Sequence, residues 1–584
     1  MEIAAVRSTV SRFRFDSRWI FLGIPTIIVA YLTVVPVGML IVGAFKEGDP
    51  GTAGAFTLQH LINAYGDPTI YPLFINSATY ALGTALVSFV LGTTLAWIVE
   101  RTNTPFKSLF YSLTLIPFII PGVLHTIAWI YLLSPRIGFI NRVLVTVFNL
   151  PSPPFDIYTV GGMVWVEAMH LSPMVFVLMA ASFRSMDPAL EEASIASGAG
   201  VFTTLRRVTL PLMLPSIASV ILIMFIRGLE SFEVPALIGL QAQIRVFTSR
   251  IYLALKSFPP DFGLAGAYSL ILIALSVIGI YFYNRALSRS EKFATISGKA
   301  FRPRTVELGP WRFLTLGIFV VYFTLIVGLP FFILLWGSLV PYFTPPSLDM
   351  LDKLTLNNYR DLNIFACTPN QNICLRTRTA FFNSLMLGVG SATIVMALTA
   401  VISWITVRTN WRGRGLLDLI TFIPITVPGL VLAVSLMWVY LTFKVGIYGT
   451  LGILLIAYIT RFLPYGIRTN SAAMVQINRE LEEAAHISGG SWWETFRRVT
   501  LPLLKPGLLA GWVYILIVSM RELSTSILLS SSQSQVVAVL VFDMIDGGNV
   551  PRLAALSVLF IITLILLALG AQKLGGRFGI REEH

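Results

Sequence analysis

Long apolar segments recur along almost the whole chain, and short polar loops separate them. A helix that crosses a bilayer needs about 20 mostly apolar residues, and about twelve segments satisfy this requirement. The pattern predicts an all-α multi-pass membrane protein with about 12 transmembrane helices. The segments lie near residues 20–44, 74–99, 107–133, 158–183, 209–238, 264–287, 311–340, 380–407, 415–443, 449–470, 502–531 and 552–571.

The composition agrees with a membrane location. Hydrophobic residues make up 55% of the 584 residues and charged residues 12%, with a mean hydropathy of +0.78. About a quarter of a soluble chain is charged, so a water-soluble enzyme is disfavoured. The net charge of +13 is explained by basic loops beside anionic membrane lipid. Nucleic acid is not expected as a partner, because no basic domain stands apart from the apolar segments.

Lysine and arginine are distributed unequally over the loops. If the N-terminus is cytoplasmic, the cytoplasmic loops hold more than twice as many of these residues as the opposite loops. This bias predicts that both termini are cytoplasmic. The first apolar segment follows a basic tail and is long enough to remain as an anchor, so we expect no cleaved signal peptide.

Two cysteines, Cys367 and Cys374, then fall in an outward loop between the seventh and eighth segments. An oxidising outer compartment favours a local disulfide between them, and two free thiols are the alternative. Two cysteines cannot form a four-ligand site, and we expect no metal site.

The chain contains an internal repeat. Asn76-Ser77 recurs 307 positions later as Asn383-Ser384, and residues 191–217 match residues 482–508 at 14 of 27 positions. Six segments per half is an even number, so both halves enter the membrane in the same direction as two parallel pseudo-two-fold repeats. We therefore expect a first membrane domain at 1–290, a cytoplasmic linker at 291–310 and a second membrane domain at 311–584. The first half carries 16 extra residues, which we place in the outward loop near 134–157.

The best-matching block lies in one cytoplasmic loop of each half, at 187–210 and 478–501. In the first loop Asp187 and Pro188 can start a short helix, and Gly198 can end it. A second short helix is expected to follow and to stop near Pro211. The second loop repeats this arrangement, with Asn478 at the start, Gly489 as the terminator and Pro502 as the stop.

Both loops read Glu-Glu-Ala-x3-Ser-Gly, followed by Arg-Arg-Val-Thr-Leu-Pro-Leu. This pattern resembles the EAA loop of ABC importer permeases that work with a substrate-binding protein. The resemblance implies a fused permease with the type I ABC importer transmembrane fold, in the cell inner membrane. It further implies that each loop is a coupling helix seated on one of two cytoplasmic ATPase subunits, and that an extracytoplasmic binding protein delivers the solute. The coupling residues would be Glu191, Glu192, Ala193, Gly198, Glu482, Glu483, Ala484 and Gly489.

The glutamates of these loops have two interpretations. They contact the ATPase directly, or they pair within the chain with Arg206 and Arg207 in the first loop and with Arg497 and Arg498 in the second. Exposed pairs of this kind contribute at most about 1 kcal/mol.

The chain lacks the motifs of a nucleotide site. Gly298-Lys299 is followed by Ala300 and has no upstream glycine, whereas a phosphate-binding loop needs that glycine and a hydroxyl for magnesium. We expect no enzyme activity and no cofactor on this chain, with ATP and Mg bound by the partner ATPase subunits.

Ionisable residues within the apolar segments mark a second candidate site, because each costs several kcal/mol at membrane depth. Helical spacing places Arg227, Glu230 and Glu233 on one face of the fifth segment. They line a pathway for a charged solute, or they hold the halves together as an ion-pair network, for example through Glu230 and Arg521. The matching part of the eleventh segment holds Arg521, Glu522 and Ser524.

A smaller polar group consists of Glu167 and His170 in the fourth segment and His125 in the third. It assists a cation pathway, or it forms helix-packing hydrogen bonds.

The solute is suggested by resemblance alone. The stretches 230–239 and 125–129 resemble permeases usually assigned to ferric iron uptake. Related permeases carry thiamine, polyamines, phosphonates or sulfate, and these solutes are the alternatives. A secondary transporter driven by an ion gradient would also fit parallel repeats, but it does not explain two matching loops.

Overall fold

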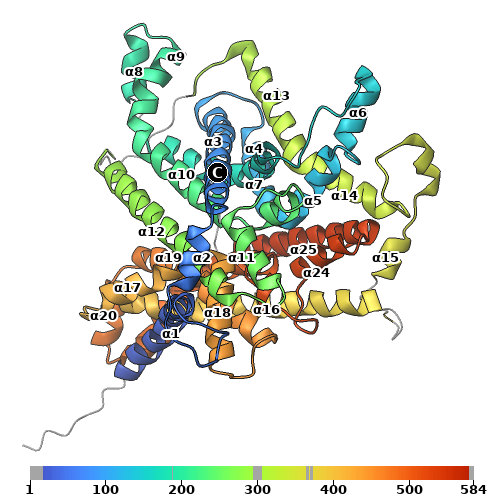
Figure 1. Cartoon of the computed structure of the whole chain (residues 1–584). Helices are drawn as coiled ribbons and strands as arrows, with labels where there is room; N and C mark the ends of the chain where they lie inside the picture. Colours follow the sequence, from blue (N-terminus) through green and yellow to red (C-terminus); the bar gives the residue numbers. More distant parts are fainter. Residues whose placement is uncertain (1–17, 187–188, 294–304, 363–366, 368–371, 578–584) are drawn as a thin grey trace, which may run out of the picture.

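The computed structural model describes residues 18–186, 189–293, 305–362, 367 and 372–577. These residues form helices and loops, with two isolated β-bridges and no β-strand among them. Asp187, Pro188 and most of the 291–310 linker lie outside the described residues (Figure 1).

The described residues of the first half form twelve α-helices. They are α1 (Arg18–Ala44), α2 (Gln59–Gly66), α3 (Ile70–Arg101), α4 (Lys107–Leu115), α5 (Gly122–Leu133), α6 (Phe139–Phe148), α7 (Val160–Ser185), α8 (Ala189–Ala196), α9 (Val201–Thr204), α10 (Leu210–Glu230), α11 (Phe247–Lys256) and α12 (Phe262–Phe293).

The second half repeats this order with few changes. Its helices are α13 (Arg312–Phe323), α14 (Leu329–Leu339), α15 (Asn357–Asp361), α16 (Asn372–Arg408), α17 (Arg414–Phe422), α18 (Gly429–Thr442), α19 (Leu451–Gln476), α20 (Glu480–Ile487), α21 (Trp492–Thr495), α22 (Leu501–Met520), α23 (Ser526–Leu529), α24 (Val537–Asp546) and α25 (Val550–Arg577). Helix α6 lies where the extra residues of the first half were expected.

Ten helices among the described residues are long and apolar enough to cross a membrane, or up to 12 if two bent pairs each count as one span. The bent pairs are the predicted third and ninth segments, which turn by 98° and 109°. Each bend falls at a Pro-Gly step, Pro121-Gly122 and Pro428-Gly429, where proline cannot continue the preceding helix. Each of the segments predicted at 107–133 and 415–443 is therefore a bent pair of helices rather than one continuous helix.

The two halves exchange their first helices. Helix α1 packs against α18 of the second half, and α14 packs against α5 of the first half. Gly43 of α1 lies directly against the indole of Trp438, where a Cβ atom would come within 2.2 Å of the ring. A hydrogen bond of 3.2 Å also joins the hydroxyls of Tyr31 and Tyr440. These contacts contribute to the interface between the repeats.

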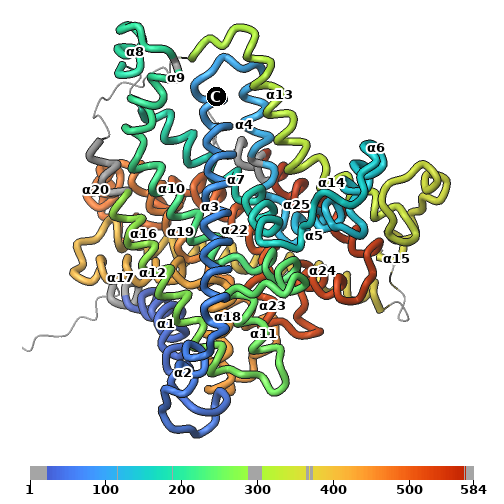
Figure 2. Tube along the Cα trace, turned by 45° about the horizontal axis from the view of Figure 1, so that its top comes forward, coloured from blue at the N-terminus to red at the C-terminus, as the bar shows by residue number. Residues whose placement is uncertain are grey.

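The short loop helices lie on opposite sides of the helix bundle. Helices α8 and α20 lie toward the left in both views, whereas α6 and α15 lie toward the right (Figures 1 and 2). The loop that follows α15 contains Cys367, which is joined to Cys374 in a disulfide.

Candidate transport pathway and coupling loops

Both candidate coupling loops are built in the same way. Helices α8 and α20 each end at a glycine with a left-handed backbone, Gly198 at φ +86° and Gly489 at φ +87°. The Gly198 amide donates to the Ile195 carbonyl, and the next amide donates to the Ser194 carbonyl. The second loop repeats both hydrogen bonds, which together form the usual glycine-terminated helix end. The local sequence thus folds into the predicted helix and glycine bend twice.

The segments after these bends differ from the expected short, separate helices. Helix α9 continues through one π-helical turn, Leu205–Thr209, into α10, and α21 continues through Phe496–Thr500 into α22. In this widened turn the Leu210 amide donates to the Leu205 carbonyl. The extra width accommodates Pro211, whose ring would otherwise clash with the preceding turn. The expected stops at Pro211 and Pro502 were wrong, and the loop is joined rigidly to a membrane helix.

The first glutamate of each loop pairs inside the protein, with a partner that the sequence did not predict. Glu191 lies 3.4 Å from Arg101, and Glu482 lies 3.4 Å from Arg408. Their partners are therefore Arg101 and Arg408, not the four arginines of the loops themselves. Both partners are the last residues of long helices, α3 and α16, where a cation is favoured by the helix dipole.

The second glutamate of each loop faces solvent. Glu192 and Glu483 are exposed, as are the neighbouring Ala193 and Ala484. The exposed side of each short helix therefore carries a carboxylate beside a small residue, which leaves room for another surface to approach.

The second candidate site forms where membrane helices break. Helix α10 ends at Glu230, and the Ser231 amide donates a hydrogen bond to the Gly228 carbonyl. Helix α22 ends at Met520, just before Arg521. The predicted continuous helices at 209–238 and 502–531 were therefore wrong, and Glu233 does not share a helical face with Arg227. Irregular backbone at membrane depth is tolerated where it lines a cavity.

A cavity of about 230 Å³ lies at these breaks, between the two halves. All six residues predicted for the pathway line it, together with Glu167 and His170 from the smaller polar group. The structure therefore brings both groups into one chamber. Its principal polar lining comprises Glu167, His170, Arg227, Glu230, Glu233, Arg461, Tyr465, Tyr514, Arg521, Glu522 and Ser524.

Some of these charges neutralise each other. Arg227 lies 3.4 Å from Glu230, and Arg461 lies 3.1 Å from Glu522. The expected pair between Glu230 and Arg521 is not formed, because Arg227, one helical turn away, pairs with Glu230 instead. Within the described residues, no hydrogen bond or ion pair engages the Glu233 carboxylate.

Two arginines connect the halves across this cavity. Arg227 of the first half donates a hydrogen bond of 2.6 Å to the Tyr465 hydroxyl of the second half. Arg521 of the second half donates to the Phe118 carbonyl of the first half. These two hydrogen bonds join the halves at the chamber, and a relative movement of the halves would break them.

The smaller polar group makes packing contacts. The Glu167 carboxylate accepts a hydrogen bond from Ser231, and His125 Nε2 accepts one from the Trp129 indole. An indole nitrogen only donates, so His125 Nε2 carries no proton and the ring is neutral. Glu167 and His170 also line the chamber, so packing contacts and a place at the candidate pathway coincide in this group.

Three further lining residues, Arg461, Tyr465 and Tyr514, were not predicted from the sequence to belong to the pathway. Arg461 is a charge within the tenth apolar segment, and it occupies the position that His170 occupies in the first half, 291 residues earlier. That correspondence could have identified Arg461 from the sequence. Nothing in the sequence distinguishes the two tyrosines, because aromatic residues are common in membrane helices.

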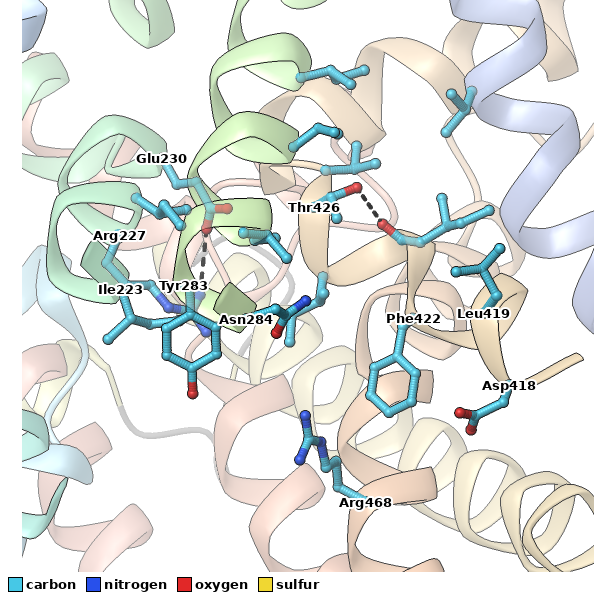
Figure 3. A pocket seen from close by; sticks show the side chains of 18 of the residues that line it. Ile223, Arg227, Glu230, Tyr283, Asn284, Asp418, Leu419, Phe422, Thr426 and Arg468 are labelled. Carbon is cyan, nitrogen blue, oxygen red and sulfur yellow. Dashed lines mark hydrogen bonds and ion pairs between the residues drawn. The ribbon is translucent and has the colours of Figure 1, made fainter. Parts of the chain in front are cut away.

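A larger cleft of about 620 Å³ adjoins the chamber, with Arg227 and Glu230 lining both. Figure 3 shows these two side chains on one wall, with Phe422 and Asp418 opposite. The cleft also reaches Asn284, near the end of α12. It therefore leads from the charged chamber toward the side of the predicted cytoplasmic loops.

The arrangement of two like halves, two matched loops and a shared charged chamber fits one family. The model of the binding-protein-dependent transport system inner membrane component matches residues 92–291 and 392–575, more than half of the chain. This chain belongs to that family. It is a multi-pass permease of the ABC importer type, with one family unit in each half.

Individual relatives of this permease cover most of its length. The ferric transport system permease protein of Actinobacillus pleuropneumoniae is 24% identical over 93% of this chain and 76% of its own. An Fe(3+)-transport system permease protein of Haemophilus influenzae is 23% identical over 82% of this chain and 84% of its own. A spermidine/putrescine transport system permease protein from the same species is 29% identical, but over only 31% of this chain and 68% of its own.

Proposed function

We propose that this permease carries ferric iron across the cell inner membrane as the membrane subunit of an ATP-driven importer. The observation that carries the proposal is the charged chamber between two family units, each with its own short loop helix, α8 or α20, on the predicted cytoplasmic side. The choice of ferric iron is supported by the ferric transport permeases of Actinobacillus pleuropneumoniae and Haemophilus influenzae, which match along most of the chain.

Two ATPase subunits would bind at α8 and α20, one on each helix. The exposed pairs Glu192-Ala193 and Glu483-Ala484 supply the contact surface. ATP and Mg would be held by these subunits, since this sequence has no phosphate-binding loop. The binding protein would dock on the opposite side, where α6 and α15 lie, and both termini would be cytoplasmic.

Transport would proceed by alternating access. A cleft runs from the chamber toward the predicted cytoplasmic side, where the ATPase subunits would bind. Closure of the ATPase subunits on ATP would draw α8 and α20 together, break the contacts of Arg227 and Arg521 across the halves, and open the chamber to the binding protein. ATP binding can drive this change only if the ATP-bound ATPase binds the two conformations of the permease with different affinity.

The test is reconstitution of the permease with its ATPase and binding protein in proteoliposomes. We expect uptake of ferric iron that requires ATP and the iron-loaded binding protein. Spermidine, thiamine, phosphonate and sulfate are the comparison solutes, and preference for any of them would reject ferric iron. Uptake by the permease alone under an ion gradient would reject the ATP-driven mechanism.

A further inference from the structure

Two buried arginines anchor the candidate coupling helices to the membrane helices. We infer that Arg101 and Arg408 are positioning residues that transmit the movement of the coupling helices to the transport pathway. The inference rests on the proposed function and concerns side chains that do not themselves touch the solute.

Each arginine contacts two elements at once. Arg101, only 2% exposed, donates a hydrogen bond of 3.0 Å to the Phe183 carbonyl near the end of α7 and pairs with Glu191 of α8. Arg408, 5% exposed, donates to the Met474 and Ile477 carbonyls at the end of α19 and pairs with Glu482 of α20. The last carbonyls of a helix have no partner within it, so the guanidinium satisfies them.

The glutamate extends the connection to a further helix. The Thr209 hydroxyl donates a hydrogen bond of 2.7 Å to Glu191, and the Thr500 hydroxyl donates one of 2.9 Å to Glu482. Each threonine is buried and ends the π-helical turn from which α10 or α22 continues. Helices α10 and α22 end at the charged chamber. One arginine and one glutamate therefore link three membrane helices of a half to its coupling helix.

The duplication indicates that this linkage serves the mechanism. The two arginines are 307 residues apart, whereas the two glutamates and the two threonines are each 291 apart. The same contacts therefore form in both halves, although the first half has 16 extra residues between the arginine and the glutamate. The arginine, the glutamate and the threonine are buried or nearly so in both halves, whereas the adjacent Glu192 and Glu483 are exposed. The two glutamates of each loop thus have separate tasks, the first to hold the helix and the second to face the partner.

The expected effect is a loss of coupling rather than a loss of assembly. The fully assembled complex is reconstituted, and ferric iron uptake and ATP hydrolysis are measured in the same proteoliposomes. For Arg408→Gln and Arg101→Gln we expect the ratio of iron taken up to ATP hydrolysed to fall about fivefold or more. Arg408→Lys should recover only part of the ratio, because an ammonium cannot reach the carbonyls and Glu482 in the geometry of a planar guanidinium.

The control is Arg412→Gln, four residues beyond Arg408 and exposed, which should leave the ratio unchanged. If Arg408→Gln does not assemble, Glu482→Gln is measured instead, since it removes the charge and keeps an acceptor for Thr500. An unchanged ratio in the assembled variants would overturn the inference. Absence of ATP-dependent uptake in the unmodified complex would instead reject the proposed function, so the two failures are distinguishable.

Discussion

Arg227 reaches across the boundary between the two halves and donates a hydrogen bond of 2.6 Å to the hydroxyl of Tyr465. The same guanidinium pairs with Glu230 within its own helix. It therefore lies at the junction of the charged chamber and the larger cleft, and its contact with Tyr465 exists only while the halves keep their present positions.

Replacing Tyr465 with Phe should shift the permease away from this conformation. A hydrogen bond to a charged group contributes about 1.5 kcal/mol or more, which corresponds to about tenfold in population. The native cysteines are both in the disulfide, so Cys in place of Asn284 would be the only free thiol in the cleft. We expect Tyr465→Phe to slow the labelling of this cysteine by a thiol reagent several-fold, because the conformation with the open cleft becomes less populated.

The matched control for that measurement is Tyr71→Phe. Tyr71 is 71% exposed and lies outside both cavities, so the labelling rate should not change. Equal rates in Tyr465→Phe and in the unmodified protein would mean that the bond does not hold the halves in place.

Glu233 and Glu522 separate the two interpretations of the charged chamber. Glu522 pairs with Arg461 and accepts hydrogen bonds from Thr525, whereas Glu233 has no partner among the described residues. We expect Glu522→Gln to reduce stability by about 1–2 kcal/mol, because it removes the ion-pair partner of the half-buried Arg461. Glu233→Gln should leave the unfolding temperature unchanged or raised, since it removes an unpaired carboxylate.

Iron uptake is then compared in the same two variants. A marked loss of uptake in the stable Glu233→Gln protein would support a pathway role for this carboxylate. Full uptake in Glu233→Gln, together with the instability of Glu522→Gln, would mean that the chamber serves mainly to join the halves.

Substitutions at the two glycine bends test whether the left-handed backbone stabilises the loop helices. A Cβ atom at Gly198 or Gly489 would meet no atom within 4 Å, so an alanine there changes only the backbone conformation. The left-handed conformation costs an alanine about 1 kcal/mol. We expect faster amide hydrogen exchange in α8 of Gly198→Ala and in α20 of Gly489→Ala, by about fivefold.

Gly200 provides the control for the first loop. Its surroundings are equally open, and its backbone does not require a positive φ. If amide exchange in α8 is also faster in Gly200→Ala, the effect comes from the loss of any glycine in this loop and not from the left-handed bend.

The proposed orientation can be tested with two exposed positions. Phe258 is fully exposed between α11 and α12, and Arg412 is exposed between α16 and α17. In intact spheroplasts a membrane-impermeant thiol reagent should label Phe258→Cys but not Arg412→Cys. Labelling of Arg412→Cys should require lysis, and the reverse pattern would place the loops on the other side.

Local features of this permease were predictable from the sequence. The apolar segments, the repeat and the glycine-terminated loop helices depend on composition and on residues that lie near one another in the chain. Most of the charged residues that line the chamber could be predicted, because a charge in an apolar segment is costly wherever the helix packs.

Only the tertiary structure decided which of these residues meet. Arg101 and Glu191 are 90 positions apart, and Arg227 and Tyr465 are separated by 238. Helices surrounded by lipid and by other helices are apolar on every side, so their sequences do not indicate which face meets which neighbour. The breaks after Glu230 and Met520 were likewise hidden, because they are stable only when the opposite half completes a cavity around the exposed backbone.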